Sequence, residues 1–177
     1  MKRMSSETLS ALISTLFFLF VLLPIFYLWI PYEIISSRFL YSFNIGVLRY
    51  LGICFIILGI IIGITCSIGF VVQGKGSPIP FTPTKELVVT GIYRYVRNPL
   101  YIAGSSVLIG ETLLFQSFGL LIYFIFMFGV FYVQALLEET HLETEFGETY
   151  NHYRESVPRW IPNFKPYEDK IRDQLKA

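Results

Sequence analysis

The stretch "TGIYRYVRNPLYIAG", residues 90–104, joins a polar segment of the chain to an apolar one. Arg94, Arg97 and Asn98 stand just before Pro99, and a long apolar run follows. Proline is favoured at the first position of a helix, because its missing N–H is one that would have no partner there. The stretch therefore predicts a hydrophobic helix that begins at Pro99 and carries cations and an amide at its mouth.

The composition places this helix in a membrane protein. The chain has 177 residues, of which 54% are hydrophobic, 18% aromatic and only 15% charged, whereas soluble domains carry about 25% charged residues. The net charge of +1 gives no indication of a nucleic-acid partner. Cys54 and Cys66 both lie in an apolar run, which argues against a disulfide framework.

Four apolar runs are long enough to be read as membrane spans. A spanning helix needs about 20 mostly apolar residues, and the runs cover residues 11–30, 46–72, 99–115 and 118–137. Lys2 and Arg3 precede the first run, as in a signal peptide, but this run is longer than the apolar region of such peptides. We therefore predict an all-α integral membrane protein, a single domain over residues 1–177 with about four transmembrane helices.

The cations indicate how these helices are oriented. Cytoplasmic loops carry an excess of Lys and Arg. One side of the predicted membrane would hold Lys2, Arg3, Lys75, Lys85, Arg94, Arg97, Arg154, Arg159 and Lys165, and the other side Arg38 and Arg49. We expect a multi-pass protein whose two termini and 73–98 loop are cytoplasmic.

Two features inside the predicted spans have more than one interpretation. Gly59 and Gly63 form a GxxxG motif, with Gly52 one heptad earlier, and close helix packing inside the bundle is favoured over a dimer interface. Glu111 lies within the third span, where an ionisable side chain suggests a function. Because it is near the outer end of that span, its carboxylate could equally extend to the membrane surface.

The polar residues on the cytoplasmic side fall into two blocks, residues 73–101 and 138–162. The second block reads "EETHLETEFGETYNHYRESVPRWIP", and its apolar residues Leu142, Phe146, Tyr150 and Tyr153 recur at helical spacing. This pattern predicts a helix that continues from the fourth span and ends before Pro158. The two blocks together place cations and carboxylates at neighbouring helix ends on the cytoplasmic side. A small ligand that carries both a positive and a negative charge would fit between them.

These blocks also carry a resemblance. "KELVVTGIYRYVRNPLYIAG", followed by a glutamate pair and "FGETYNHYRESVPRWIP", resembles the isoprenylcysteine carboxyl methyltransferase family and its phospholipid methyltransferase relatives. Members of this family are small membrane enzymes that use S-adenosyl-L-methionine. The resemblance extends from Gln73 to Pro162. It implies methyl transfer to a lipophilic small-molecule or lipidated acceptor among membrane lipids, with a cytoplasmic C-terminal helix capping the cofactor pocket and no metal.

By position, the resemblance implies a set of cofactor-binding residues. Glu138 would bind the ammonium group of the cofactor, and the planar donor fork of Arg97 would bind its carboxylate. These two residues are also the candidates for positioning the cofactor for catalysis. The implied set is Gln73, Lys85, Glu86, Leu87, Val88, Tyr93, Arg97, Asn98, Pro99, Leu100, Tyr101 and Glu138.

The chain departs from the family pattern at two positions. Asn98 stands where the family has histidine, so hydrogen bonding is retained there but acid–base chemistry is not. Gln134 stands where prenylcysteine-methylating members have an arginine for the carboxylate of the acceptor. This favours an acceptor other than a prenylcysteine carboxylate. Gln134 and Arg154 are the candidate residues for binding the acceptor.

Two other classes of protein remain open at this point. Membrane sterol reductases have a distantly similar helical arrangement, and Lys75, Lys85, Arg94 and Arg97 could bind the phosphates of NADPH. A non-catalytic membrane protein is the third interpretation, in which Asn98 and Gln134 mark a site that has lost its activity.

Overall fold

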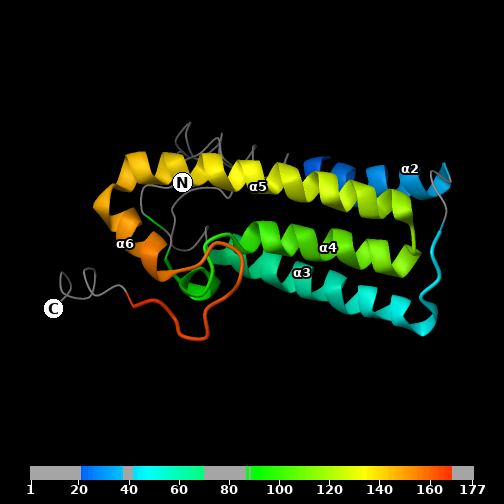
Figure 1. Cartoon of the computed structure of the whole chain (residues 1–177), viewed down its shortest axis with the longest axis horizontal. Coiled ribbons are helices and arrows are strands. Elements are labelled where there is room, and N and C mark those ends of the chain that lie inside the picture. The colour runs from blue at the N-terminus through cyan, green and yellow to red at the C-terminus, as the bar shows by residue number, and fades with distance from the viewer. Residues whose placement is uncertain (1–20, 38–41, 70–86, 88, 169–177) are drawn as a thin grey trace, which may run out of the picture.

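The computed structural model describes residues 21–37, 42–69, 87 and 89–168 (Figure 1). Regular structure within this part of the chain is helical, apart from one isolated β-bridge between Ser42 and Ser117. Three long helices run beside one another, α3 (Leu51–Gly69), α4 (Pro99–Phe115) and α5 (Phe118–Phe146). The shorter α2 (Ile30–Ser36) lies along α5 at one end of the bundle. The predicted all-α class is confirmed.

Two of the predicted spans correspond to helices long and apolar enough to cross a membrane. They are the helices over Gly46–Ile68 and Phe118–Phe146, the first of which begins with the 3₁₀ turn η3 (Gly46–Tyr50). The third predicted span coincides with α4 but has only 17 residues. The first falls partly outside the described residues, although residues 21–36 are helical through the π-helical turn η2 (Ile25–Trp29) and α2. The arrangement of four spans therefore stays a prediction.

A tight turn separates α4 from α5, between the third and fourth of the predicted spans. Gln116 ends α4 in the left-handed conformation, with φ 53°. Ser117 then caps α5, because its hydroxyl accepts a hydrogen bond from the backbone N–H of Leu120 at 3.3 Å. The turn makes the two helices antiparallel, so the start of α4 lies beside the later turns of α5.

Glycines allow α3 and α4 to approach each other closely. A Cβ added at Gly59 would lie 2.6 Å from the Ala103 carbonyl oxygen and 2.8 Å from Val107 Cγ2, and one added at Gly110 would lie 2.6 Å from the carbonyl oxygen of Gly52. We call this contact the glycine seam. The predicted packing within the bundle is confirmed, although Gly63 of the GxxxG motif is peripheral, with Ala103 Cβ at 3.9 Å.

Glu111 is enclosed by the bundle and does not reach the surface. Only 7% of the residue is exposed, and its Oε2 has no hydrogen-bond partner within the described part of the chain. Tyr27 and Tyr123 are close enough to interact with it electrostatically. The alternative in which Glu111 extends to the membrane surface is wrong, because neighbouring helices cover this face of α4.

The single C-terminal helix predicted after the fourth span is also wrong, because the chain breaks at Gly147. The helix α5 ends at Phe146, Gly147 takes φ 52°, and α6 (Glu148–Ser156) starts in a new direction. Glycine takes positive φ without steric cost, which permits this turn. The apolar face that the pattern predicted still forms, since Tyr150 and Tyr153 are buried against Val89 and Val157 with Leu142 and Phe146 beside them.

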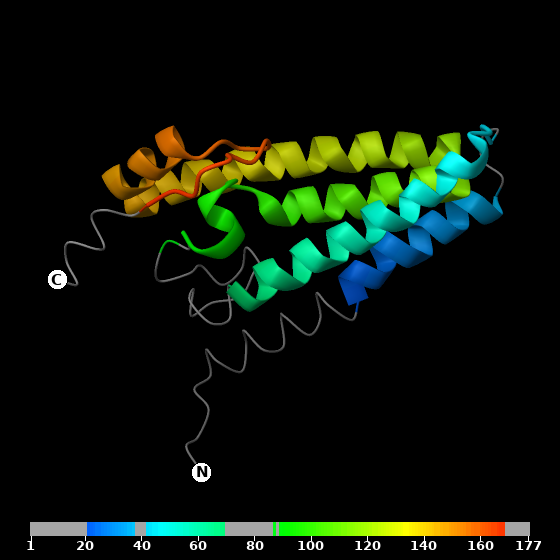
Figure 2. The ribbon, with the colours of Figure 1, turned by 90° about the horizontal axis from the view of Figure 1, so that it is seen from below.

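After α6 the chain returns toward the bundle along residues 157–168, which we call the return segment (Figure 2). Backbone hydrogen bonds fix it to the residues before α4, with Asn163 N–H donating to the Tyr95 carbonyl and Tyr167 N–H to the Arg94 carbonyl, each at 2.9 Å. The Arg94 side chain donates in return from Nε to the Tyr167 carbonyl at 2.7 Å. Segments far apart in the sequence therefore meet where α4 begins.

Candidate functional site

The polar end of the bundle is built where a 3₁₀ turn leads into α4. The turn η5 (Gly91–Arg94) begins with Gly91 at φ 57° and is followed by Val96, which is 1% exposed. Buried Pro99 then starts the helix. Because this backbone is held on one side by Val96 and on the other by the return segment, the side chains of Arg97 and Asn98 have a fixed direction toward α5.

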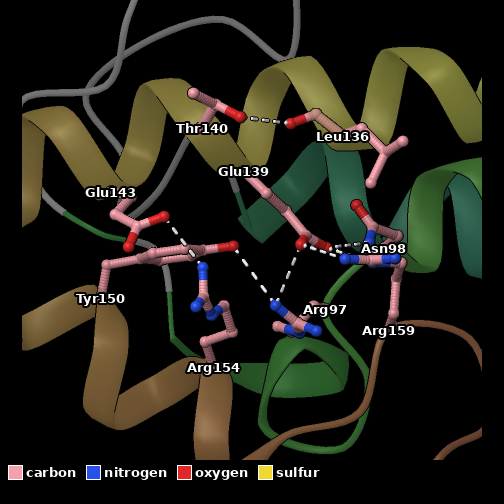
Figure 3. Close-up of polar contacts among 9 residues, drawn as sticks. All are labelled: Arg97, Asn98, Leu136, Glu139, Thr140, Glu143, Tyr150, Arg154 and Arg159. Atoms are coloured by element: carbon pink, nitrogen blue, oxygen red, sulfur yellow. Dashed lines mark hydrogen bonds and ion pairs between the residues drawn. The ribbon is translucent and has the colours of Figure 1, made fainter.

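The first group of polar residues is the ion-pair cluster, which consists of Arg97, Asn98, Glu139, Tyr150 and Arg159 (Figure 3). Arg159 binds Glu139 through two parallel hydrogen bonds, Nε to Oε1 at 2.9 Å and Nη2 to Oε2 at 2.8 Å. Arg97 Nη1 lies 3.2 Å from Glu139 Oε2, and Asn98 Nδ2 donates to Oε1 at 3.2 Å. Arg97 Nη1 also donates to the Tyr150 hydroxyl at 3.4 Å. One carboxylate thus joins α4, α5 and the return segment.

The charges in this cluster do not balance. Two guanidinium groups share one carboxylate, and the side chains of Glu139 and Arg97 are only 8% and 10% exposed. The hydrogen bonds to Glu139 raise the pKa of Arg159 above its usual value. Arg97 Nε is buried and has no hydrogen-bond partner in the described part of the chain. The cluster therefore retains a positive charge and an unused donor on Arg97.

The second group is the tyrosine–glutamate cluster, which consists of Tyr93, Tyr101 and Glu138. The Tyr101 hydroxyl donates to Glu138 Oε2 at 3.0 Å, and its ring stacks on Phe131 with the centroids 5.6 Å apart. Burial, and then the neighbouring Cys66 and Glu138, raise the pKa of Tyr93 well above its usual value, so this phenol is neutral. Glu138 itself is exposed, in contrast to Glu139. The surrounding protein nevertheless desolvates its carboxyl group and raises its pKa, so Glu138 is exposed as a residue but lies in a partly desolvated site.

The structure brings together seven of the residues predicted to bind the cofactor. Arg97 and Asn98 face Glu139, whereas Tyr93 and Tyr101 lie by Glu138. Pro99 and Leu100 form the first turn of α4 between these two groups. Leu87 instead packs against the apolar core of Tyr150 and Tyr153. The remaining four predicted residues lie outside the described part of the chain: Gln73, Lys85, Glu86 and Val88.

The two residues predicted to bind the acceptor lie in different places. Gln134 is half-buried on α5, about one turn before Glu138. Arg154 is on α6, where Nη1 contacts Glu143 Oε2 at 2.9 Å, and both of these side chains are 43% exposed. In Figure 3 this pair lies beside Tyr150, separate from the contacts of Glu139.

Three residues of the ion-pair cluster were not among the site residues predicted from the sequence: Glu139, Tyr150 and Arg159. The spacing along α5 could have indicated that Glu139 is buried. Glu139 lies seven residues after Tyr132 and eleven after Phe128, so the three side chains share one face of the helix. That face packs against the return segment, so a carboxylate at its end is buried. No comparable signal exists for Arg159, which reaches Glu139 only because the chain turns at Gly147 and returns.

Comparisons with known proteins agree with the resemblance seen in the sequence. The phospholipid methyltransferase family profile matches residues 47–149, more than half of the chain. A protein-S-isoprenylcysteine O-methyltransferase of Schizosaccharomyces pombe is 36% identical over 77 residues, which are 43% of this chain and 33% of that protein. The chain therefore aligns with about a third of the length of this relative. No solved structure matches the chain. The family match contains both Arg97 and Glu139, and this chain belongs to the phospholipid methyltransferase family.

Proposed function

We propose that this protein transfers a methyl group from S-adenosyl-L-methionine to a lipophilic acceptor in the membrane. Membership of the phospholipid methyltransferase family supports the reaction class. The observation that carries the site is that two groups lie at the end of the bundle where α4 begins: Glu138, held by Tyr101, and Arg97 Nε, a buried donor without a partner in the described part of the chain. The sulfonium of the cofactor supplies an activated methyl group.

The residues at this end fit both charges of the cofactor. Glu138 binds the ammonium, and Tyr101 holds that carboxylate in place through its 3.0 Å hydrogen bond. Arg97 Nε is available for the carboxylate, since Glu139 occupies only Nη1. The first turn of α4 adds to this, because its amino end is not capped by the Asn98 side chain and favours negative charge. Asn98 acts indirectly, by holding Glu139.

The rest of the polar end positions the cofactor and keeps water away. The apolar core of Val89, Tyr150, Tyr153 and Val157 closes one side of it. Alignment and removal of water can supply most of the acceleration for a methyl group that is already activated, since effective molarities reach roughly 10⁵ M. Arg97 and Glu138 therefore act on the rate by orientation rather than by proton transfer.

The acceptor we propose is a lipid or lipidated molecule without the carboxylate of a prenylcysteine. The family is described by methyl transfer to phospholipids and the Schizosaccharomyces pombe relative by isoprenylcysteine. Gln134 favours the former, because the amide cannot form the charged, two-point contact that arginine makes with a carboxylate. We further propose four spans, with both termini and this polar end in the cytoplasm.

Titration calorimetry on the purified full-length protein tests the cofactor site. We expect S-adenosyl-L-methionine to bind, and Glu138→Ala to weaken it roughly ten- to a hundredfold, which corresponds to one charge-assisted hydrogen bond. Glu143→Ala is the matched control, because Glu143 is a glutamate on the same helix whose contact is with Arg154. Equal binding by the native protein and Glu138→Ala would remove Glu138 from the site.

A parallel titration with NADPH separates the reaction classes. Binding of NADPH without S-adenosyl-L-methionine would identify a reductase and overturn the proposal. If neither binds, the non-catalytic interpretation is favoured. The acceptor is tested with labelled methyl donor, where we expect incorporation into a lipid extract and little into a farnesylcysteine analogue.

A further inference from the structure

The return segment places an aromatic residue against the apolar surface of α5. The ring of Trp160 lies 5.4 Å from that of Phe128 and stacks on Tyr132 at 6.1 Å, with 16° between the planes of Trp160 and Tyr132. Its neighbour in sequence, Arg159, binds Glu139. The chain therefore passes within one residue from the ion-pair cluster to the part of α5 predicted to span the membrane.

The positions of these contacts along α5 show how far the return segment reaches. Tyr132 precedes Glu139 by seven residues and Phe128 by eleven. At a rise of 1.5 Å per residue, they lie about 10 Å and about 16 Å below Glu139 along the helix axis. Both belong to the predicted span over residues 118–137. Trp160 therefore packs against the half of this predicted span that is nearer to Glu139.

The residues after Trp160 present apolar side chains outward. Ile161 is 79% exposed and Phe164 is fully exposed, at 103%, and Lys165 beside it is also exposed. They are held in this position, because Asn163 donates from its backbone to the Tyr95 carbonyl and from Nδ2 to the Ser156 carbonyl, both at 2.9 Å. Pro162 restricts the backbone further. The segment is therefore an ordered structure with an uncovered apolar edge.

We propose that Trp160–Lys165 is an interfacial membrane anchor, in which Ile161 and Phe164 enter the boundary between headgroups and acyl chains. The bilayer is the partner because the adjacent Trp160 packs on Phe128 and Tyr132 of α5, and Val133 and Leu137 of that helix are 55% and 61% exposed. Lys165 complements anionic headgroups. The inference rests on the proposed membrane position of α5 but not on methyl transfer.

The anchor has a consequence for the polar end of the bundle. Arg159 directly precedes the anchored residues, and its guanidinium holds Glu139, which in turn contacts Arg97. Insertion of Ile161 and Phe164 would fix the return segment against α5 and so favour the closed ion-pair cluster. A lipid surface would then favour the ordered form of the site as well as supply the acceptor.

Tryptophan fluorescence provides a direct test, since the chain has only 2 tryptophans. The background carries Trp29→Phe and Trp160→Phe, and the reporter is Phe164→Trp in the full-length protein. Glu155→Trp in the same background is the matched control, on the exposed surface of α6. Both proteins are placed in nanodiscs of phosphatidylcholine and phosphatidylglycerol with lipids brominated near the headgroup.

We expect quenching of the position-164 reporter to be at least about threefold stronger than quenching of the position-155 control. Adding Lys165→Gln to the position-164 protein should weaken its quenching. Equal and weak quenching of both reporters would overturn the anchor. In detergent, a loss of quenching at position 164 that grows with protein concentration would also overturn the anchor. Such a result would show that a second copy of the chain covers this edge. None of these readouts requires cofactor or acceptor, so failure of the anchor is distinguishable from failure of the proposed function.

Discussion

The glycine seam and the ion-pair cluster join the same helix, α4, to its neighbours by opposite means. In the seam, α4 approaches α3 so closely that a Cβ at Gly59 would lie 2.6 Å from the Ala103 carbonyl oxygen. In the cluster, the start of α4 meets α5 and the return segment through long side chains that share Glu139. The seam depends on the absence of side-chain atoms, whereas the cluster depends on charge.

The glycine seam therefore holds the helices of the bundle together, whereas the ion-pair cluster shapes the candidate site. The seam joins two helices along their lengths and has no freedom to adjust, because backbone atoms are in contact. The cluster joins three segments through one carboxylate and carries an excess positive charge, which would favour a ligand with a negative charge. Substitutions in the two regions therefore have different expected signatures.

The largest effect on stability is expected for Glu139→Ala. Removing the carboxylate leaves Arg97 and Arg159 close together with no counter-charge, and breaking a buried pair in this way costs about 3 kcal/mol or more. Thermal unfolding of the purified protein in detergent measures the loss. Glu143→Ala is the control, since its ion pair is exposed. A melting temperature unchanged by Glu139→Ala would show that the cluster contributes no net stability.

The seam is tested by Gly59→Ala, which adds one methyl group where Val107 Cγ2 and the Ala103 carbonyl oxygen leave no space. Overpacking of this kind costs about 1–3 kcal/mol. Gly129→Ala is the matched control on α5, because a Cβ there meets nothing within 4 Å. Alanine favours the helix by up to about 1 kcal/mol at that position. If the two variants unfold at the same temperature, α3 and α4 are not in close contact.

The comparison also shows what the sequence reveals. The seam was predictable because Gly52 and Gly59 recur at helical spacing, and the start of α4 was predictable because Pro99 is a local signal. The break at Gly147 was not, since the apolar positions 142, 146, 150 and 153 keep their spacing through it. Arg159 and Glu139 meet only after that break reverses the chain, and their pairing is set by tertiary structure. The residues predicted from the sequence that lie together at one end of the bundle include Arg97, Asn98 and Glu138, whereas Glu139 was not among the predicted site residues.

A smaller effect is expected at Asn98, where the chain departs from the family pattern. Its side chain is buried and donates to Glu139 Oε1, so Asn98→Leu removes a hydrogen bond to a charged acceptor, about 1.5 kcal/mol. Asn98→His can donate to the same oxygen and should lose less. Thermal unfolding ranks the variants as native, then Asn98→His, then Asn98→Leu. A reversed order of the two variants would mean that the volume of the side chain matters more than its hydrogen bond.

The smallest effect on stability is expected for Arg154→Ala, which sharpens the assignment of the acceptor site. The pair with Glu143 is exposed, and exposed pairs contribute between about 0 and 1 kcal/mol, so we expect a loss below about 0.5 kcal/mol. Arg154 lies on α6, whereas Gln134 lies on α5 near Glu138, where the methyl donor is proposed to bind. Arg154→Ala should therefore leave KM for a lipid acceptor unchanged.

Gln134→Arg should instead create methylation of a farnesylcysteine carboxylate, because a guanidinium can bind it at two points. A rise in KM with Arg154→Ala at unchanged melting temperature would place the acceptor against α6 and exclude Gln134 as its main contact.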